Sequence, residues 1–312
     1  MDAALNIEFK KIYGTAAEWM FYCAGRVNLI GEHTDYNGGL VMPCAISMGT
    51  HLLAARNNEG VIRLHSLNEP GAVEIPVTGE ITVQSLHWVN YPLGVIHLLK
   101  EHTAFSSGFN LLYQGNLPVG AGLSSSAALA MVTAFALNQL LHAGIPLKEL
   151  ALLCQKAEHE FAGVPCGIMD QYAVAFGKKD NAILLNCALP EHEYIPFNTG
   201  EYQLLIVNTN KPRKLVESKY NERLAECTTA LRIFQQALPV EHLCAISFHE
   251  FEQHRHLLQN ATLEKRVLHL ISEQFRVGEA RDALRFGELF TFGKLMYASH
   301  RSLKEFYEVT GP

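Results

Sequence analysis

The chain has 312 residues, of which 48% are hydrophobic and 18% charged, and its formal net charge is −6. This composition excludes disordered, fibrous and collagen-like proteins, and the length predicts a globular protein of two domains. Lysines and arginines are scattered, so no basic surface is predicted for nucleic acid or an anionic membrane. Small molecules are therefore the expected partners, and the oligomeric state is left open.

The seven cysteines are widely spaced and include no C-x-x-C pair. Their odd number and spacing favour buried, free thiols in a reducing compartment over disulfides or a zinc site. Residues 1–14 carry acids and lysines where a signal peptide needs an apolar core, and no apolar run reaches 18 residues. We expect a cytoplasmic protein.

Short apolar or alternating runs predict strands over residues 49–56, 61–66, 109–114 and 182–187. One helix is expected to begin at the serines of residues 124–126, which would cap it, and to close at Gly144; a second runs from about residue 146 to Gly163. Residues 204–207 predict a buried strand, and from Leu215 onward the helical period dominates. We place domains at residues 1–175 and 176–312.

The first candidate site is the segment GRVNLIGEHTDYNGG, residues 25–39. It places Arg26, Glu32, His33 and Asp35 among glycines, and such polar groups are normally solvated unless something polar binds them. Paired carboxylates beside an imidazole suit a ring of sugar hydroxyls. The alternative is a charged surface loop without a ligand.

The second candidate site is PVGAGLSSSAA, residues 118–128. Glycines let the backbone approach an anion closely, and the first free N–H groups of the following helix attract phosphate. The segment is neither a Walker A loop nor G-x-G-x-x-G, since Ser125 stands where the third glycine belongs. The alternative is a capped core helix after a glycine turn.

The third candidate site is CGIMDQ, residues 166–171, where Asp170 is a single carboxylate in an apolar stretch. A buried carboxylate has to be paired or functional, because its unpaired charge is costly to bury. A helix N-cap is the alternative explanation. Glu158, considered alone, is expected to be a solvated helix residue.

Together these three segments resemble the signatures of the galactokinases, a branch of the GHMP small-molecule kinases. The resemblance runs from about Cys23 to Pro312 and includes residues 88–91, 214–220 and 300–309. The EHTDYN string favours galactokinases over mevalonate, homoserine and N-acetylgalactosamine kinases. The resemblance implies two α+β domains with the active site in the cleft between them. The implied reaction is the ATP-dependent phosphorylation of galactose at its anomeric hydroxyl, giving galactose 1-phosphate and ADP.

The resemblance also implies the function of single residues. Asp170 matches the catalytic base, and Arg26 matches a neighbouring cation that stabilises the transition state. The positions that match galactose contacts are Glu32, His33, Thr34, Asp35, Gly167, Asp170 and Tyr220. Those that match the ATP phosphate loop are Gly120, Ala121, Gly122, Leu123, Ser124, Ser125 and Ser126, and those that match Mg²⁺ ligands are Ser126 and Glu158.

Two departures from the family pattern bear on these expectations. Cys23 and Ala24 stand where the family has Ala-Pro, which removes a constraint on the turn before Arg26. The family also has a third glycine-rich motif near its C-terminus, beyond the point that corresponds to Pro312, the last residue of this sequence. We therefore expect a truncated second domain and at most weak activity. An inactive galactokinase-like fragment and a regulatory sensor that binds galactose and ATP therefore remain as alternatives. The intact serines of residues 124–126 argue against the sensor.

Overall fold

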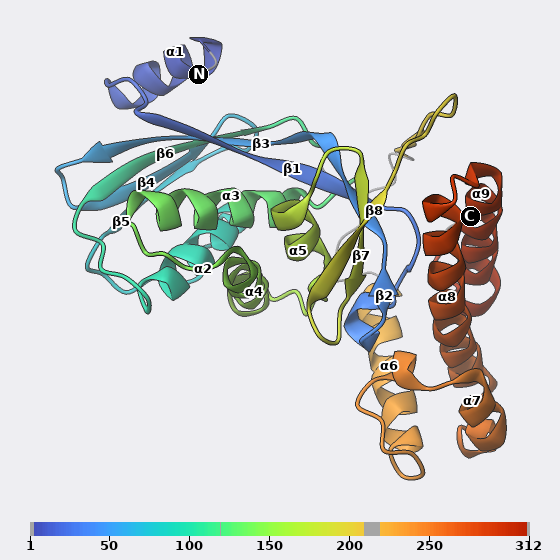
Figure 1. Cartoon of the computed structure of the whole chain (residues 1–312). Helices are drawn as coiled ribbons and strands as arrows, with labels where there is room; N and C mark the ends of the chain where they lie inside the picture. The colour runs from blue at the N-terminus through green and yellow to red at the C-terminus, as the bar shows by residue number, and fades with distance from the viewer. Residues whose placement is uncertain (1–2, 119, 209–218, 311–312) are drawn as a thin grey trace. The chain divides into compact units, whose positions relative to one another are not determined.

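The computed structural model describes residues 3–118, 120–208 and 219–310, and the chain forms two compact units (Figure 1). Unit 1 contains the residues up to Arg26 with 46–166 and 170–175, and unit 2 contains 27–45, 167–169 and the residues from Phe176 onward. Continuous domains 1–175 and 176–312 were predicted from the sequence. The last division between the units also falls after residue 175, and residues 27–45 and 167–169 belong to unit 2 as well. Two strands, β1 (Trp19–Asn28) and β3 (Pro43–Asn57), run from one unit into the other.

The strands of unit 1 are paired around β6 (Gly108–Gly115). β3 lies antiparallel to β6, with Thr50 opposite Gly115, and β4 (Val61–Ser66) lies parallel to β6 on its other side. β5 (Ala72–Pro76) pairs antiparallel with β4. The strands predicted at residues 49–56, 61–66 and 109–114 are therefore confirmed.

Helices cover both faces of these strands (Figure 1). The helices of unit 1 are α1 (Ala3–Tyr13), α2 (Asn90–Leu99), α3 (Ser125–Leu140), α4 (Leu147–Ala157) and α5 (Met169–Phe176), with a short 3₁₀ turn at His87–Val89. Leu5 and Phe9 of α1 pack with Leu53 and Leu112 of the sheet, while α2, α3 and α4 lie on the opposite face. α4 continues as one π-helical turn, Glu158–Ala162, and the helix predicted over residues 146–162 is confirmed.

The predicted serine cap of α3 is wrong. Ser124 occupies the N-cap position, but its backbone is left-handed (φ +58°) and its side chain makes no capping bond. A side-chain cap requires an extended backbone at the N-cap, which would direct the hydroxyl to the free amides of the first turn. α3 also ends at Leu140, earlier than the predicted Gly144.

Unit 2 combines three strands with a set of helices. β2 (Leu40–Val41) and β8 (Glu191–Pro196) both pair antiparallel with β7 (Asn181–Asn186), which confirms the strand predicted at 182–187. The helices are α6 (Lys219–Phe234), α7 (Phe248–His254), α8 (Ala261–Arg285) and α9 (Leu289–Ser302). Shorter turns occupy Asp35–Asn37, Leu243–Ala245, Arg255–Leu257 and Leu303–Tyr307. The predicted helical character is confirmed from Lys219 onward, and residues 214–218 lie outside the described residues.

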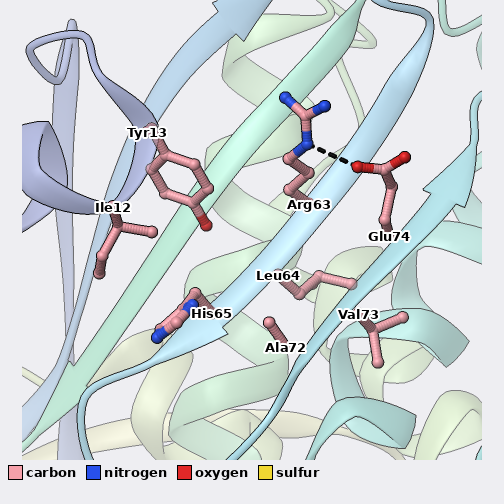
Figure 2. Close-up of a pocket in the computed structure, with 8 residues that line it drawn as sticks. All are labelled: Ile12, Tyr13, Arg63, Leu64, His65, Ala72, Val73 and Glu74. Carbon is pink, nitrogen blue, oxygen red and sulfur yellow. Dashed lines mark hydrogen bonds and ion pairs between the residues drawn. The ribbon is translucent and has the colours of Figure 1, made fainter.

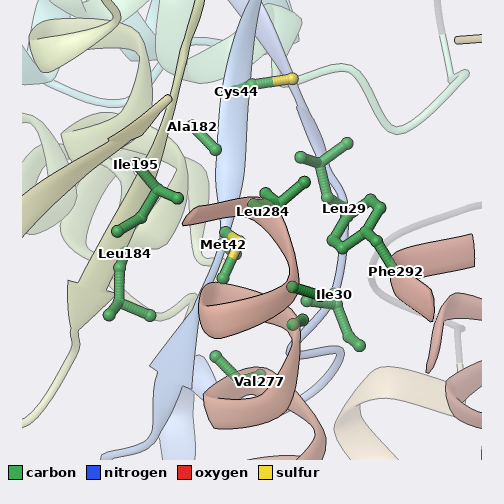
Figure 3. Packing of buried hydrophobic residues seen from close by; sticks show 12 residues of the cluster. Leu29, Ile30, Met42, Cys44, Ala182, Leu184, Ile195, Val277, Leu284 and Phe292 are labelled. Atoms are coloured by element: carbon green, nitrogen blue, oxygen red, sulfur yellow. The ribbon is translucent and has the colours of Figure 1, made fainter. Parts of the chain in front are cut away.

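The core of unit 2 fastens the segment after β1 to helix α8. Figure 3 shows Leu29 and Ile30 packed with Met42 and with Val277 and Leu284 of α8. Val277 and Leu284 are seven residues apart and therefore lie on one face of α8. Residues 31–39 follow directly, so this loop begins at a segment that is packed firmly into the core of unit 2.

The predicted strand at residues 204–207 is wrong. No described strand pairs with this segment, and Leu205 and Val207 are 82% and 71% exposed. An apolar run without a neighbouring ladder has no partner for its backbone groups and does not form a strand. All seven cysteines are free, four of them buried, and no helix among the described residues is long and apolar enough to cross a membrane.

Candidate functional site

The loop of residues 31–39 in unit 2 has a strained, left-handed backbone at its centre. His33 has φ +64°, and Gly31 and Gly38 flank it at +93° and +68°. Left-handed backbone is uncommon for a residue with a Cβ and is concentrated at functional sites. The conformation therefore marks this loop as a candidate binding site.

The Thr34 side chain connects the two ends of this loop by hydrogen bonds. It is fully buried, and its hydroxyl lies 2.8 Å from the carbonyl oxygens of both Gly31 and Leu40. The Asn37 amide adds a bond to the His33 carbonyl, 2.9 Å away. The Thr34 side chain thus holds the shape of the loop, and a direct sugar contact by this residue stays a prediction.

The polar side chains of the loop gather with two residues from distant parts of the chain. A Cβ on Gly167 would lie 2.1 Å from Oδ2 of Asp35, so only glycine fits against this carboxylate. The ring centroid of Tyr220 lies 6.1 Å from that of His33, and Asn28 donates to Glu32 over 3.0 Å. Unit 2 therefore places Gly167 against Asp35 and Tyr220 near His33, which follows Glu32 in the loop.

Two tyrosines, the half-buried Tyr36 and the buried Tyr307, extend this group, and the sequence analysis missed them. Tyr36 OH lies 2.9 Å from Nδ1 of His33 and 2.9 Å from the hydroxyl of Tyr307. Burial raises the pKa of both phenols above its ordinary value, so both stay protonated at neutral pH. Tyr36 belongs to the EHTDYN string itself, which was the available signal.

In unit 1 the predicted Arg26 and Asp170 form an ion pair. Nη2 and Nε of Arg26 lie 2.5 and 3.0 Å from Oδ1 of Asp170, and Nη1 donates to the Gly122 carbonyl over 2.6 Å. Gly25 must be a glycine here, because a Cβ would lie 2.8 Å from the Leu123 carbonyl oxygen. Asp170 lies in the first turn of α5 and not at its N-cap, which is Ile168, so the capping alternative is wrong.

The glycine–serine loop joins this ion pair to the start of α3. Gly120 and Gly122 both have φ +72°, and Ser124 is left-handed as well. The Ser124 hydroxyl is buried and has no hydrogen-bond partner within the described residues. A turn of this kind directs backbone N–H groups into a concave surface at a helix N-terminus, which suits phosphate.

Glu158 is buried beside this loop, so the expectation of a solvated residue is wrong. It is 5% exposed, its carboxylate accepts bonds from Ser126 (3.3 Å) and Gln171 (2.7 Å), and burial together with the Asp170 charge raises its pKa to about 7. A divalent cation would favour the charged form. A hydroxyl and a carboxylate at this spacing therefore fit Mg²⁺ that also binds phosphate oxygens.

A separate hollow of about 340 Å³ lies between the end of α1 and strands β4 and β5 (Figure 2). Its lining includes Tyr13, Arg63 and Glu74. Arg63 is already paired with Glu74 over 2.6 Å and with Glu59 over 2.5 Å, and Tyr13 donates to a backbone carbonyl. The hollow contains none of the predicted site residues.

The chain is 45% identical to the galactokinase of Staphylococcus carnosus over 315 residues, covering 100% of this chain and 81% of that protein. The galactokinase of Enterococcus faecalis is 44% identical over 314 residues with the same coverage. The chain belongs to the galactokinase family. The profile described as the galactokinase galactose-binding signature matches residues 7–56, and that of the GHMP kinases N terminal domain matches residues 90–178.

Solved structures agree with this assignment. The structure of Lactococcus lactis galactokinase complexed with galactose is 41% identical and covers 99% of this chain and 81% of its own, with a TM-score of 0.94. The mevalonate kinase of Methanococcus jannaschii, at 18% identity and a TM-score of 0.60, shares the fold alone. The predicted family and the mixed α+β GHMP-kinase fold are confirmed.

Proposed function

We propose that this galactokinase-family chain transfers the γ-phosphoryl group of ATP to the anomeric hydroxyl of galactose, giving galactose 1-phosphate and ADP. The observation that carries the proposal is the Arg26–Asp170 ion pair, whose guanidinium also binds the carbonyl of the phosphate loop at Gly122. One cation thus joins the candidate base to the candidate phosphate cradle. The galactose-bound relative from Lactococcus lactis supports the choice of sugar.

Galactose recognition falls to the polar group of unit 2. The carboxylates of Glu32 and Asp35 accept hydrogen bonds from sugar hydroxyls, and the His33 imidazole contributes a further polar group. Gly167 leaves room for the Asp35 carboxylate, and the Tyr220 ring borders the group. A site built from such oriented acceptors discriminates between sugars that differ in one hydroxyl.

The ATP phosphates bind at residues 120–126, where backbone amides and the N-terminus of α3 supply positive potential. The buried Ser124 hydroxyl offers an unused donor to the same loop. Ser126 and Glu158 would hold Mg²⁺. When bound, the ion neutralises charge on the phosphate oxygens during transfer.

Asp170 accepts the proton of the anomeric hydroxyl as that oxygen bonds to the γ-phosphorus and the bond to the ADP oxygen breaks. Both bonds from Arg26 reach Oδ1 of Asp170, and the carboxylate is 29% exposed. Oδ2 is therefore the oxygen that takes the proton. Arg26 stabilises the negative charge that spreads over the transferred group.

Replacement of Asp170 by Asn tests this function, because the amide keeps the shape of the carboxylate but cannot accept the proton. We expect galactose-dependent ADP release to fall by about 10²-fold to 10⁴-fold, while galactose binding measured by calorimetry persists. Asp180→Asn, the same change at an exposed loop residue, is the matched control. Turnover of Asp170→Asn equal to that of the wild type would eliminate Asp170 as the base.

A further inference from the structure

Two side chains of helix α8 form hydrogen bonds with the backbone on both sides of Glu32. Oε1 of Glu273 accepts hydrogen bonds from the amides of Gly31 (2.9 Å) and Glu32 (3.2 Å), and Nε2 of His269 lies 3.1 Å from the Glu32 carbonyl oxygen. His269 and Glu273 are four residues apart and therefore lie on the same face of the helix. Both are fully buried.

The buried carboxylate of Glu273 is itself held in place by neighbouring side chains. Nε of Arg276 donates to Oε2 over 2.7 Å, and the Ser299 hydroxyl of α9 donates to Oε1 over 2.5 Å. Pairing and hydrogen bonding of this kind offset the cost of burying a carboxylate. Glu273 therefore presents a strong acceptor to the two loop amides.

His269 is held in one tautomer. The Glu32 carbonyl can only accept, so Nε2 of His269 carries the hydrogen, and Nδ1, 2.8 Å from the Ser302 hydroxyl, accepts from that hydroxyl. Burial lowers the pKa of His269 to about 4, and the ring is neutral at physiological pH. The donor to Glu32 is thus permanently aimed.

The hydrogen bonds made by His269 and Glu273 lie next to the strained part of the loop. His33 follows Glu32 directly and has the left-handed backbone (φ +64°) that a side chain disfavours. Such a conformation persists only where the surroundings determine it. At the far end of the loop, Gln274 of the same helix accepts from the Leu40 amide over 2.8 Å, so α8 holds both ends of residues 31–40.

We infer that His269 and Glu273 are positioning residues for sugar recognition: together they fix the peptide groups on either side of Glu32 and so aim Glu32 and His33 at galactose. This inference rests on the proposed function, because it takes these two residues as galactose contacts. It makes α8, which contributes no predicted sugar contact of its own, a determinant of galactose affinity.

The test compares two replacements of His269 in the full chain. His269→Phe keeps a ring of similar size, which preserves the ring contact with Tyr307, but removes the donor to Glu32. His269→Gln retains an N–H that reaches the same carbonyl. Asn260→Ala is the matched control, because it removes the cap of α8 without touching the loop.

Galactose and ATP dissociation constants are measured by calorimetry, and amide hydrogen exchange is followed over residues 29–36. We expect His269→Phe to weaken galactose binding about tenfold and to speed exchange of the loop amides, with ATP binding unchanged. His269→Gln should recover affinity to within about threefold of the wild type. Asn260→Ala should lower the melting temperature and leave galactose affinity unchanged.

The outcomes separate the two hypotheses. Equal galactose affinity of the wild type and His269→Phe, or an equal loss in Asn260→Ala, overturns the positioning effect alone. A wild-type chain that binds ATP but no galactose overturns the proposed function and the positioning effect with it. If His269→Phe fails to fold, Ser302→Ala, which removes only the hydroxyl that orients the ring, is measured instead. It is expected to weaken galactose binding about threefold, and unchanged affinity would refute the inference.

Discussion

The buried carboxylate of Glu158 makes the stability of the protein depend on pH in an unusual direction. Its pKa is raised from 4.5 to about 7, first by burial and then by the charge of Asp170. Between these values the native state keeps a proton that the unfolded chain has lost, so the free energy of unfolding falls as pH rises. We predict that Glu158→Gln, which has no proton to lose, removes this dependence.

The expected size follows from the displacement of the pKa. One pKa unit corresponds to about 1.4 kcal/mol, so a rise from 4.5 to about 7 makes the ionised native state less stable by about 3 kcal/mol at high pH. Most of this change falls between pH 5 and pH 8. The difference in unfolding free energy between Glu158→Gln and the wild type should therefore increase by about 2 to 3 kcal/mol from pH 5 to pH 8.

Urea unfolding of both proteins at pH 5, 6, 7 and 8, without nucleotide or metal, measures this difference directly. Glu160→Gln is the matched control, because Glu160 lies in the same π-helical turn but is exposed. Its ion pair with Lys156 is long (3.9 Å) and exposed to solvent. Its unfolding free energy should follow that of the wild type at every pH. A difference in unfolding free energy between Glu158→Gln and the wild type that stays constant from pH 5 to pH 8 would refute the raised pKa. It would also remove this support for Glu158 as a ligand of a divalent cation.

Four further outcomes are expected. Gly167→Ala should weaken galactose binding at least tenfold and leave ATP binding intact, because the new methyl group would lie 2.1 Å from Oδ2 of Asp35; unchanged calorimetric affinity would contradict the packing. Glu32→Ala should cost about 1.5 to 3 kcal/mol of galactose binding, and the wild type should reject glucose; equal phosphorylation of the two sugars would show that the substrate is misassigned. Gly278→Ala, inside α8 with no neighbouring side chain within 4 Å, should raise the free energy of unfolding in urea by up to about 1 kcal/mol and leave galactose affinity unchanged.

Elements governed by local alternation were predictable. β4 occupies the predicted residues Val61–Ser66, and its buried positions Ile62 and Leu64 alternate with partly exposed ones. Such a pattern is written into neighbouring residues, because successive side chains of a strand point to opposite faces. The helix ending at Gly163 was predictable for the same reason, since this glycine adopts the left-handed backbone (φ +70°) that closes a helix.

Features that depend on distant residues were not predictable in this way. Glu158 has the local pattern of a surface helix residue, but it is buried and hydrogen-bonded to Ser126 of α3 and Gln171 of α5, which come from other parts of the chain. The run at residues 204–207 has the local pattern of a strand but has no partner among the described strands. In both cases the neighbouring element decides whether the segment is buried or forms a strand, and the sequence of the segment itself does not specify that neighbour.

The positioning residues of α8 had a weak signal that was overlooked. Charged residues recur along this helix, and Glu273 and Glu279 look alike in sequence, yet one is fully buried and the other exposed. Glu273 lies three residues after Leu270 and four before Val277, on the face that the buried apolar positions define. A carboxylate in that register has to find partners, which here are the two loop amides, Arg276 and Ser299.

Arg26 explains why the candidate phosphate site needs no lysine in its loop. The planar guanidinium satisfies two acceptors that lie in different directions, Oδ1 of Asp170 and the Gly122 carbonyl, and this fixes its charge relative to the loop backbone before any ligand binds. An ammonium group is a point charge on a flexible stem and would have to be ordered during the reaction. Donors that are already in place cost no reorganisation when charge develops on the transferred group. Both bonds from Arg26 reach Oδ1 of Asp170, so Oδ2 lies outside the ion pair and is the oxygen that the proposed mechanism uses to accept the proton.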